Sequence, residues 1–165
     1  MPQTRTMRCR PLTSDDADLL RRATLENVNW SGPRFTAEDV DSDPRLSHYT
    51  TFDPVRGDFG LVAEEEGSPI GVCWCLFLPE DEPGFGFVDT AIPELSVWVA
   101  AESRGQGLGR MLIAATQEEA RERRIECISL SVEEGNQARM LYWSLGFHDV
   151  AGREADGVMS WHDKT

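Results

Sequence analysis

The sequence predicts one mixed α/β domain built around a single sheet, and three observations support this fold class. The length of 165 residues suits one domain. Segments with strand-like alternation and segments with helical periodicity follow one another along the chain. Apolar residues make up 40% of the chain and include five tryptophans, which is enough for a packed core. We therefore expect a single domain over residues 1–165, with no internal repeat or linker.

The first half of the chain supplies one helix and three strands. RTMRCRPL (5–12) predicts an opening strand, and SDDADLLRRATLE (14–26) predicts a helix that begins at Ser14. Residues 27–54 contain turn formers and one further candidate helix. DFGLVAEEE (58–66) and SPIGVCWCLFL (68–78) predict an antiparallel hairpin that turns at Gly67 and Ser68. Three prolines and two glycines in residues 79–93 predict a loop or a broken strand.

The second half begins with ELSVWVA (94–100), whose strict alternation predicts a strand. A glycine-rich turn follows, and then a helix that runs to about Arg124 and carries one apolar stripe. CISLSV (127–132) predicts a short strand. Asn136 is a suitable N-cap for a helix that Gly146 would end. Residues 147–150 and 157–161 predict two closing strands.

Charge and composition exclude several classes of function. The net charge of −13 opposes non-specific binding of nucleic acid, and it could attract a cationic substrate. No run approaches the roughly 18 apolar residues of a membrane span, and the N-terminal residues lack the apolar region of a secretion signal. We expect a cytoplasmic protein. The cysteines lack zinc-site spacing, so we expect no metal and interpret Cys73 and Cys75 as core or pocket lining.

The stretch SRGQGLGRML (103–112) predicts an anion site. Glycines let backbone N–H groups approach a ligand closely, and a helix N-terminus adds about half a positive charge. A dinucleotide fingerprint starting at Gly105 would need glycine where the chain has Arg110, and no Gly-Lys-Ser/Thr tripeptide of a P-loop is present. The remaining pattern is Arg-x-x-Gly-x-Gly, at Arg104, Gly107 and Gly109.

That pattern, directly after an alternating strand, resembles the cosubstrate-binding segment of the GNAT superfamily of acetyl-CoA-dependent N-acetyltransferases. ELSVWVAAESRGQGLGRML resembles the family's strand–turn–helix signature, and NQARMLYWSLGF resembles its second signature. The resemblance covers about residues 94–149, which we expect to form the cofactor-binding core. It implies a mostly antiparallel sheet flanked by helices, with acetyl-CoA as the cosubstrate.

The resemblance also implies which residues contact the cosubstrate. The amides from about Gly105 to Arg110 would cradle the pyrophosphate, and backbone groups of the strand would pair with the pantetheine arm. Asn136 would lie near that arm, although a plain N-cap explains this residue equally well. The expected cosubstrate residues are Val97, Trp98, Val99, Arg104, Gly105, Gln106, Gly107, Leu108, Gly109, Arg110 and Asn136.

Transfer of an acetyl group to a primary amine, by direct attack in a ternary complex, needs a base and an acid. Tyr142 lies on the inward face of its predicted helix, and in the family a tyrosine at this position donates the proton to sulfur; a core tyrosine is the alternative. Glu94 is the candidate base, with a water relay or a solvated strand-end carboxylate as alternatives. The histidines at 48, 148 and 162 are further candidate bases, none singled out by position.

The acceptor is not identified by the sequence beyond a small-molecule or peptide amine. In this fold, residues 27–54 and 78–93 would shape its pocket, with aromatic walls from Trp30, Tyr49, Trp74, Phe85 and Phe87. Apolar residues near the C-terminus, Val158, Met159 and Trp161, favour a homodimer over a monomer. The rival functions are a non-catalytic CoA-binding regulatory or sensor module, which would not need Tyr142, and a phosphate-binding structural domain without CoA.

Overall fold

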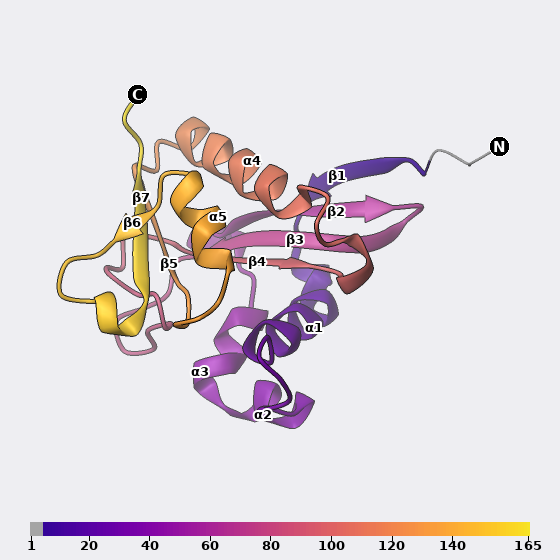
Figure 1. Cartoon of the computed structure of the whole chain (residues 1–165), viewed down its shortest axis with the longest axis horizontal. Helices are drawn as coiled ribbons and strands as arrows, with labels where there is room; N and C mark the ends of the chain where they lie inside the picture. Colours follow the sequence, from indigo (N-terminus) through magenta and orange to yellow (C-terminus); the bar gives the residue numbers. More distant parts are fainter. Residues whose placement is uncertain (1–4) are drawn as a thin grey trace.

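Seven strands form one sheet in the computed structural model, which describes residues 5–165 (Figure 1). The first four residues of the domain expected over 1–165 lie outside the described residues. The strands are β1 (Met7–Pro11), β2 (Phe59–Glu65), β3 (Ser68–Leu76), β4 (Glu94–Val99), β5 (Cys127–Ser131), β6 (His148–Asp149) and β7 (Val158–His162). Their order across the sheet is β1-β2-β3-β4-β5-β7-β6.

The neighbouring strands run antiparallel except for β4 and β5, which run parallel. This confirms the expected mostly antiparallel α/β sheet. The β2–β3 hairpin turns at Glu66 and Gly67, both with positive φ, as a two-residue turn between twisted strands requires. The turn therefore lies one residue earlier than expected, and Ser68 is already the first residue of β3.

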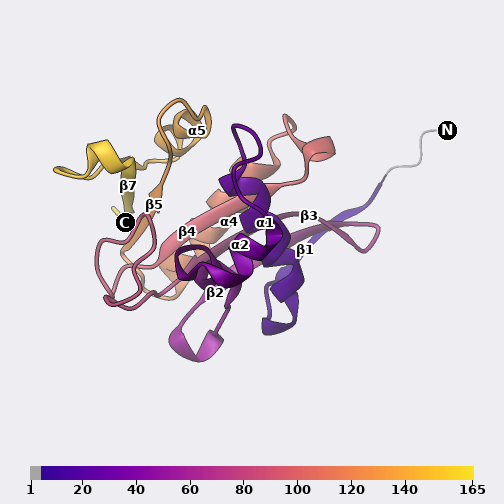
Figure 2. The same ribbon diagram turned by 90° about the horizontal axis from the view of Figure 1, so that it is seen from below.

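Helices cover both faces of the sheet (Figures 1 and 2). One face carries α1 (Ala17–Val28), α2 (Ala37–Ser42) and α3 (Pro44–Ser47), and the other carries α4 (Leu108–Glu122) and α5 (Ala138–Ser144). The second helix expected in residues 27–54 is thus a pair of short ones. Thr13, rather than Ser14, caps the turn that leads into α1, because its side chain forms a capping box with Asp16.

The alternation of β3 and β4 divides the core between the two faces. Cys73 and Cys75 belong to the cluster beneath α4, whereas Trp74 and Trp98 belong to the cluster beneath α1. Both cysteines are free and fully buried, which confirms their interpretation as core residues.

The apolar residues near the C-terminus have a different place from the one expected. Val158, Met159 and Trp161 are buried within the sheet's core, so they offer no surface to a second copy of the chain. Among residues 5–165, no helix is long and apolar enough to cross a membrane.

Candidate active site

The sheet opens between β4 and β5. β4 pairs with β3 along its whole length, from Glu94↔Leu76 to Val99↔Gly71, but it pairs with β5 only at Glu94↔Ser129. Beyond that point β5 diverges from β4, while its other edge pairs with β7. The edge of β4 from Leu95 onward therefore faces open space instead of a neighbouring strand.

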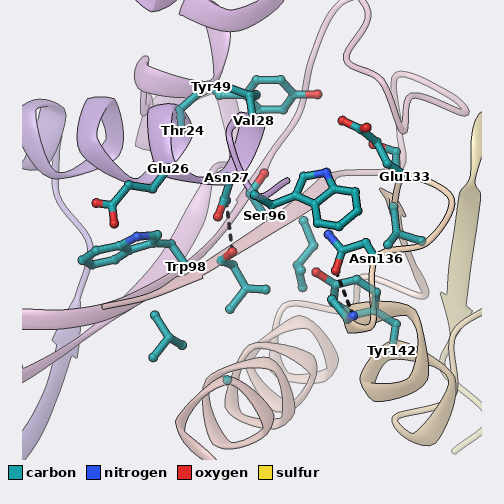
Figure 3. A pocket seen from close by; sticks show the side chains of 18 of the residues that line it. Thr24, Glu26, Asn27, Val28, Tyr49, Ser96, Trp98, Glu133, Asn136 and Tyr142 are labelled. Atoms are coloured by element: carbon teal, nitrogen blue, oxygen red, sulfur yellow. Dashed lines mark hydrogen bonds between the residues drawn. The ribbon is translucent and has the colours of Figure 1, made fainter. Parts of the chain in front are cut away.

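The backbone of β4 presents hydrogen-bonding groups to that opening. Ala100 N–H donates to Ile70 O, and hydrogen bonds alternate along an antiparallel pair. The even-numbered residues of β4 therefore direct their backbone groups to β3, and the odd-numbered ones direct theirs to the opening. Asn27 Nδ2 donates to Val97 O at 3.1 Å (Figure 3), and Arg104 Nε donates to Val99 O at 3.0 Å. These bonds satisfy two carbonyl groups and leave the N–H groups of Val97 and Val99 directed to the opening.

A cavity of about 860 Å³ occupies the opening. Its walls include β4, the end of α1, the glycine-rich turn and the face of α5. Figure 3 shows Asn136 and Tyr142 on one side of this cavity, opposite Thr24, Asn27 and Val28 of α1. The split in the sheet thus brings together residues that lie far apart in the sequence.

The glycine-rich turn lies at one end of the cavity. Gly105 and Gly107 have φ of 76° and 81°, a conformation that other residues adopt only with strain. Gly107 is the N-cap of α4 and has no side chain to satisfy the first N–H groups of that helix. Both glycines line the cavity, as does Gly109. The turn therefore directs unpaired N–H donors and the positive end of the helix dipole towards a ligand.

The residues expected to bind the cosubstrate nearly all line this cavity. Val97, Val99, Arg104, Leu108, Arg110 and Asn136 do so with the three glycines. Gln106 is exposed and does not line it. Trp98 also lines the cavity, although most of its side chain packs beneath α1, with the Arg22 guanidinium 4.8 Å from the centre of its ring. Arg110 also donates to Ser144 Oγ, which links α4 to α5.

Asn136 begins the turn that leads into α5. Its Oδ1 accepts a hydrogen bond from Ala138 N–H at 2.9 Å, but the N-cap of the helix is Gln137, one residue after the expected position. The helix begins at Ala138, and Gly146 follows its end with a φ of 90°. With Oδ1 engaged, the Nδ2 group of Asn136 is the part of the amide that can serve a ligand in the cavity.

Tyr142 projects from α5 into the wall of the cavity. The residue is 9% exposed, and its ring packs edge-on against Phe147 at 6.1 Å between centroids. Burial raises the pKa of the Tyr142 hydroxyl above its ordinary value, with a smaller contribution from Cys73. At neutral pH this hydroxyl is therefore protonated and able to donate a proton.

Glu94 is not the solvated strand-end carboxylate that one interpretation of the sequence allowed. It is 4% exposed, and it accepts hydrogen bonds from the Tyr49 hydroxyl and from Gly86 N–H. Burial raises the pKa of Glu94 to about 7, and the two hydrogen bonds only partly offset this effect. The carboxyl group can therefore gain and lose a proton near neutral pH, as a general base must.

Tyr49 connects Glu94 to the loop between β3 and β4. Its hydroxyl donates to Glu94 and accepts a hydrogen bond from Phe85 N–H at 2.9 Å. The Trp74 indole donates to Tyr49 O at 3.0 Å and so fixes the backbone beneath the ring. Burial and the nearby Glu94 charge raise the pKa of Tyr49, which keeps the hydroxyl protonated. Tyr49 therefore holds the carboxylate and the loop in one arrangement.

The expected aromatic walls are present with one exception. Trp30, Tyr49, Trp74 and Phe85 line the cavity, whereas Phe87 packs on the core beneath α1 and does not line it. Residues 27–54 supply much of the cavity wall. From residues 78–93, Phe85 alone lines the cavity. Of the three histidines, none lines this cavity. His48 instead lies against Tyr49, with ring centroids 4.3 Å apart.

Several cavity residues carry no signal in the sequence. Asn27, in the last turn of α1, contacts β4, and Arg34 forms an ion pair with Glu133, another lining residue, with an N–O distance of 2.7 Å. Asp156 reaches the cavity from the turn before β7. These residues stand in segments without periodicity or motif, so only the folded chain places them together.

The sheet split between β4 and β5, followed by a donor-rich turn at a helix N-terminus, defines an α/β domain with a cleft for an extended anionic ligand. The model of the acetyltransferase (GNAT) family matches residues 24–147, and the chain belongs to this family. No curated protein sequence matches the chain significantly.

Solved structures share the fold over nearly the whole chain. YncA from Salmonella typhimurium, solved with its cofactor acetyl-CoA, is 24% identical to this chain with a TM-score of 0.68. The match covers 97% of this chain and 96% of the YncA chain. The PaiA N-acetyltransferase from Thermoplasma acidophilum, solved with coenzyme A, is 17% identical with a TM-score of 0.68. The match covers 96% of this chain and 99% of the PaiA chain. A ribosomal-protein-alanine N-acetyltransferase from Brucella melitensis is 27% identical with a TM-score of 0.61. The match covers 94% of this chain and 99% of the Brucella chain.

Proposed function

We propose that the chain transfers an acetyl group from acetyl-CoA to a primary amine by direct attack within a ternary complex. The observation that carries this proposal is that Glu94 and Tyr142, one suited to accept a proton and the other to donate one, line the same cavity where the sheet opens. The two solved relatives that hold CoA or acetyl-CoA support the choice of cosubstrate.

The residues around the opening fit such a cosubstrate. The N–H groups of Val97 and Val99 can pair with an extended, amide-bearing arm in place of a neighbouring strand. The turn from Gly105 to Arg110 offers backbone donors and positive charge to a pyrophosphate. When bound, acetyl-CoA supplies the acyl thioester, and the other chemical roles fall to the chain's own side chains.

Each proton in the reaction has a candidate partner. The amine nitrogen forms a bond to the acyl carbon while the carbon–sulfur bond breaks. Glu94, directly or through a water relay, takes the proton that the amine loses, and its raised pKa suits that task. Tyr142 gives a proton to the departing sulfur, which becomes the free thiol. A strand N–H such as that of Val97 stabilises the charge that develops on the carbonyl oxygen.

The test is acetyl transfer across a panel of small amines and short peptides. Release of free thiol and formation of the acetylated amine, measured by mass spectrometry, should occur together in the wild-type chain. Tyr142→Phe should bind acetyl-CoA as the wild type does and form product far more slowly. A chain that binds acetyl-CoA but acetylates no amine of the panel would instead support a regulatory or sensor module.

A further inference from the structure

A second cavity of about 330 Å³ lies beside the candidate active site. One wall is formed by Pro44, Arg45 and His48, and the other by the loop from Asp81 to Phe85. Arg45 and Phe85 also line the first cavity. The two cavities are therefore neighbours that meet at these two side chains.

His48 lines the second cavity and carries buried polar atoms beside it. The residue is 6% exposed, and neither ring nitrogen has a hydrogen-bond partner. Burial lowers the pKa of His48, so the ring is neutral and offers one nitrogen lone pair and one N–H group. A buried polar group without a partner costs free energy, and a ligand that bonds to it would recover that cost.

The charges around the second cavity are mainly negative. Asp81 and Glu82 line it from an exposed acidic segment. The cation of Arg45 is engaged by Asp43, with an N–O distance of 2.7 Å. Two carboxylates thus remain uncompensated, and they favour a cation that can also donate a hydrogen bond to the free nitrogen of His48. The ring of Phe85, 47% exposed, offers an apolar surface to an alkyl chain between the two cavities.

The wall between the two cavities is thin. Gly84 lines the second cavity, and a Cβ added at this residue would overlap the Glu94 carboxylate and lie 2.7 Å from the Tyr49 hydroxyl oxygen. The backbone of this loop therefore separates the candidate base on one side from the acidic pocket on the other. One molecule that spans the wall past Phe85 would place one end beside Glu94 and the other beside His48.

We propose that the second cavity binds the distal cationic group of the amine acceptor, so that the chain prefers acceptors with two amino groups. This inference rests on the proposed function, because the first amino group is the one acetylated beside Glu94. The second ammonium group is held by Asp81 and Glu82 and donates a hydrogen bond to His48. A free diamine and a basic side chain of a peptide share this chemistry.

The experiment compares α,ω-diamines of three to eight carbons with monoamines of equal length. Each is titrated calorimetrically into the chain saturated with CoA, which allows binding without turnover. A lysine-containing tripeptide and its norleucine analogue form a second arm that distinguishes the peptide source. The best diamine should bind roughly tenfold more tightly than its monoamine, the factor expected from one charge-assisted hydrogen bond in a half-buried site.

The acidic loop supplies a matched control. Glu82→Gln should reduce the diamine's advantage to about twofold, because it removes one of the carboxylates that line the cavity. Glu80→Gln makes the same change in net charge two residues away, at a position that does not line the cavity, and should leave the advantage in place. His48→Phe keeps a flat ring against Tyr49 and removes both nitrogens, so it should lower diamine affinity but not monoamine affinity.

Equal affinity of the wild-type chain for diamines and monoamines would overturn the inference. Equal loss in Glu82→Gln and Glu80→Gln would also overturn it, because the preference would then reflect overall charge. Tight diamine binding without any acetylated product would contradict the proposed function and leave the second cavity's assignment intact. Acetylation of monoamines and diamines with equal kcat/KM and equal affinity would contradict this inference alone.

Discussion

Replacement of Gly107 by alanine should weaken CoA binding much more than it destabilises the fold. Gly107 has a φ of 81°, and a Cβ added there meets no atom within 4 Å. The cost to folding is therefore that of the left-handed backbone alone, roughly 1–2 kcal/mol, partly offset by the lower entropy of the unfolded chain. The net loss should be about 1 kcal/mol, or a fall in Tm of about 2–4 °C.

The chain contains a matched control for this strain. Gly67, in the β2–β3 hairpin turn, also has a φ of 81° and also has nothing within 4 Å of an added Cβ, but it does not line the cavity. Gly67→Ala should thus lower Tm by the same amount as Gly107→Ala. Only Gly107→Ala should weaken CoA binding, by roughly tenfold or more, the loss expected when a phosphate's charge-assisted hydrogen bond is displaced.

Two measurements separate a lost contact with CoA from the effect of backbone strain. Thermal unfolding without ligand compares the stability of the two variants, and calorimetric titration compares their affinity for CoA. If both variants bind CoA as tightly as the wild type, the glycine-rich turn does not bind the pyrophosphate. If both lose affinity equally, the loss follows from backbone strain and gives no evidence that the turn contacts CoA.

The remaining predictions concern catalysis, pH and assembly. Tyr142→Phe should retain the fold and lower kcat by about 10²-fold, and equal kcat at pH 7–9 would make Tyr142 a packing residue. The ratio of wild-type kcat/KM to Glu94→Gln kcat/KM should rise with pH up to about 7, where Glu94 becomes ionised, and then level off. Ionisation of the amine affects both proteins equally and cancels in this ratio. A ratio that does not change with pH would place the base elsewhere. The raised pKa of Glu94 means that the folded chain binds this proton more tightly than the unfolded chain. The free energy of unfolding of the wild type should therefore fall as pH rises from about 4.5 to about 7, and urea titrations of Glu94→Gln should lack that contribution. A homodimer, which the exposed Met140 and Trp143 of α5 could serve, should give twice the 18.5 kDa chain mass in light scattering, and the monomer mass would contradict it.

Much of the fold could be predicted from the sequence because local signals and tertiary structure agree. β4 alternates strictly, Gly146 ends α5 with a positive φ, and Cys73 and Cys75 share one buried face of β3. Residues 27–54 gave a weaker signal, because α2 and α3 are too short for their periodicity to appear in the sequence.

The candidate site was predictable where it depends on a motif and not where it depends on packing. The glycine-rich turn, Tyr142 and Asn136 belong to the two signatures that resemble the family. The hydrogen bond between Tyr49 and Glu94 joins residues 45 positions apart, and no local pattern indicates it. The loop over the end of β4 contributes to the burial that raises the pKa of Glu94, and the sequence predicted this segment only as a loop or a broken strand.

The three apolar residues near the C-terminus that favoured a homodimer show the opposite failure. Val158, Met159 and Trp161 read as surplus apolar surface because the sequence does not indicate that β7 lies between β5 and β6. Once placed there, these side chains complete the core. Hydrophobic content near a chain terminus therefore indicates an interface only when the sheet order is known.

We expect acetyl-CoA to bind in the opening between β4 and β5. Amide hydrogen exchange of the labelled chain, followed by NMR with and without acetyl-CoA, tests it at single residues. The N–H groups of Val97 and Val99, and those from Gly105 to Arg110, should become protected on binding, while the amides of Trp98 and Ser96 are already protected by β3. Binding of acetyl-CoA without added protection at Val97, Val99 and the glycine-rich turn would show that acetyl-CoA binds elsewhere.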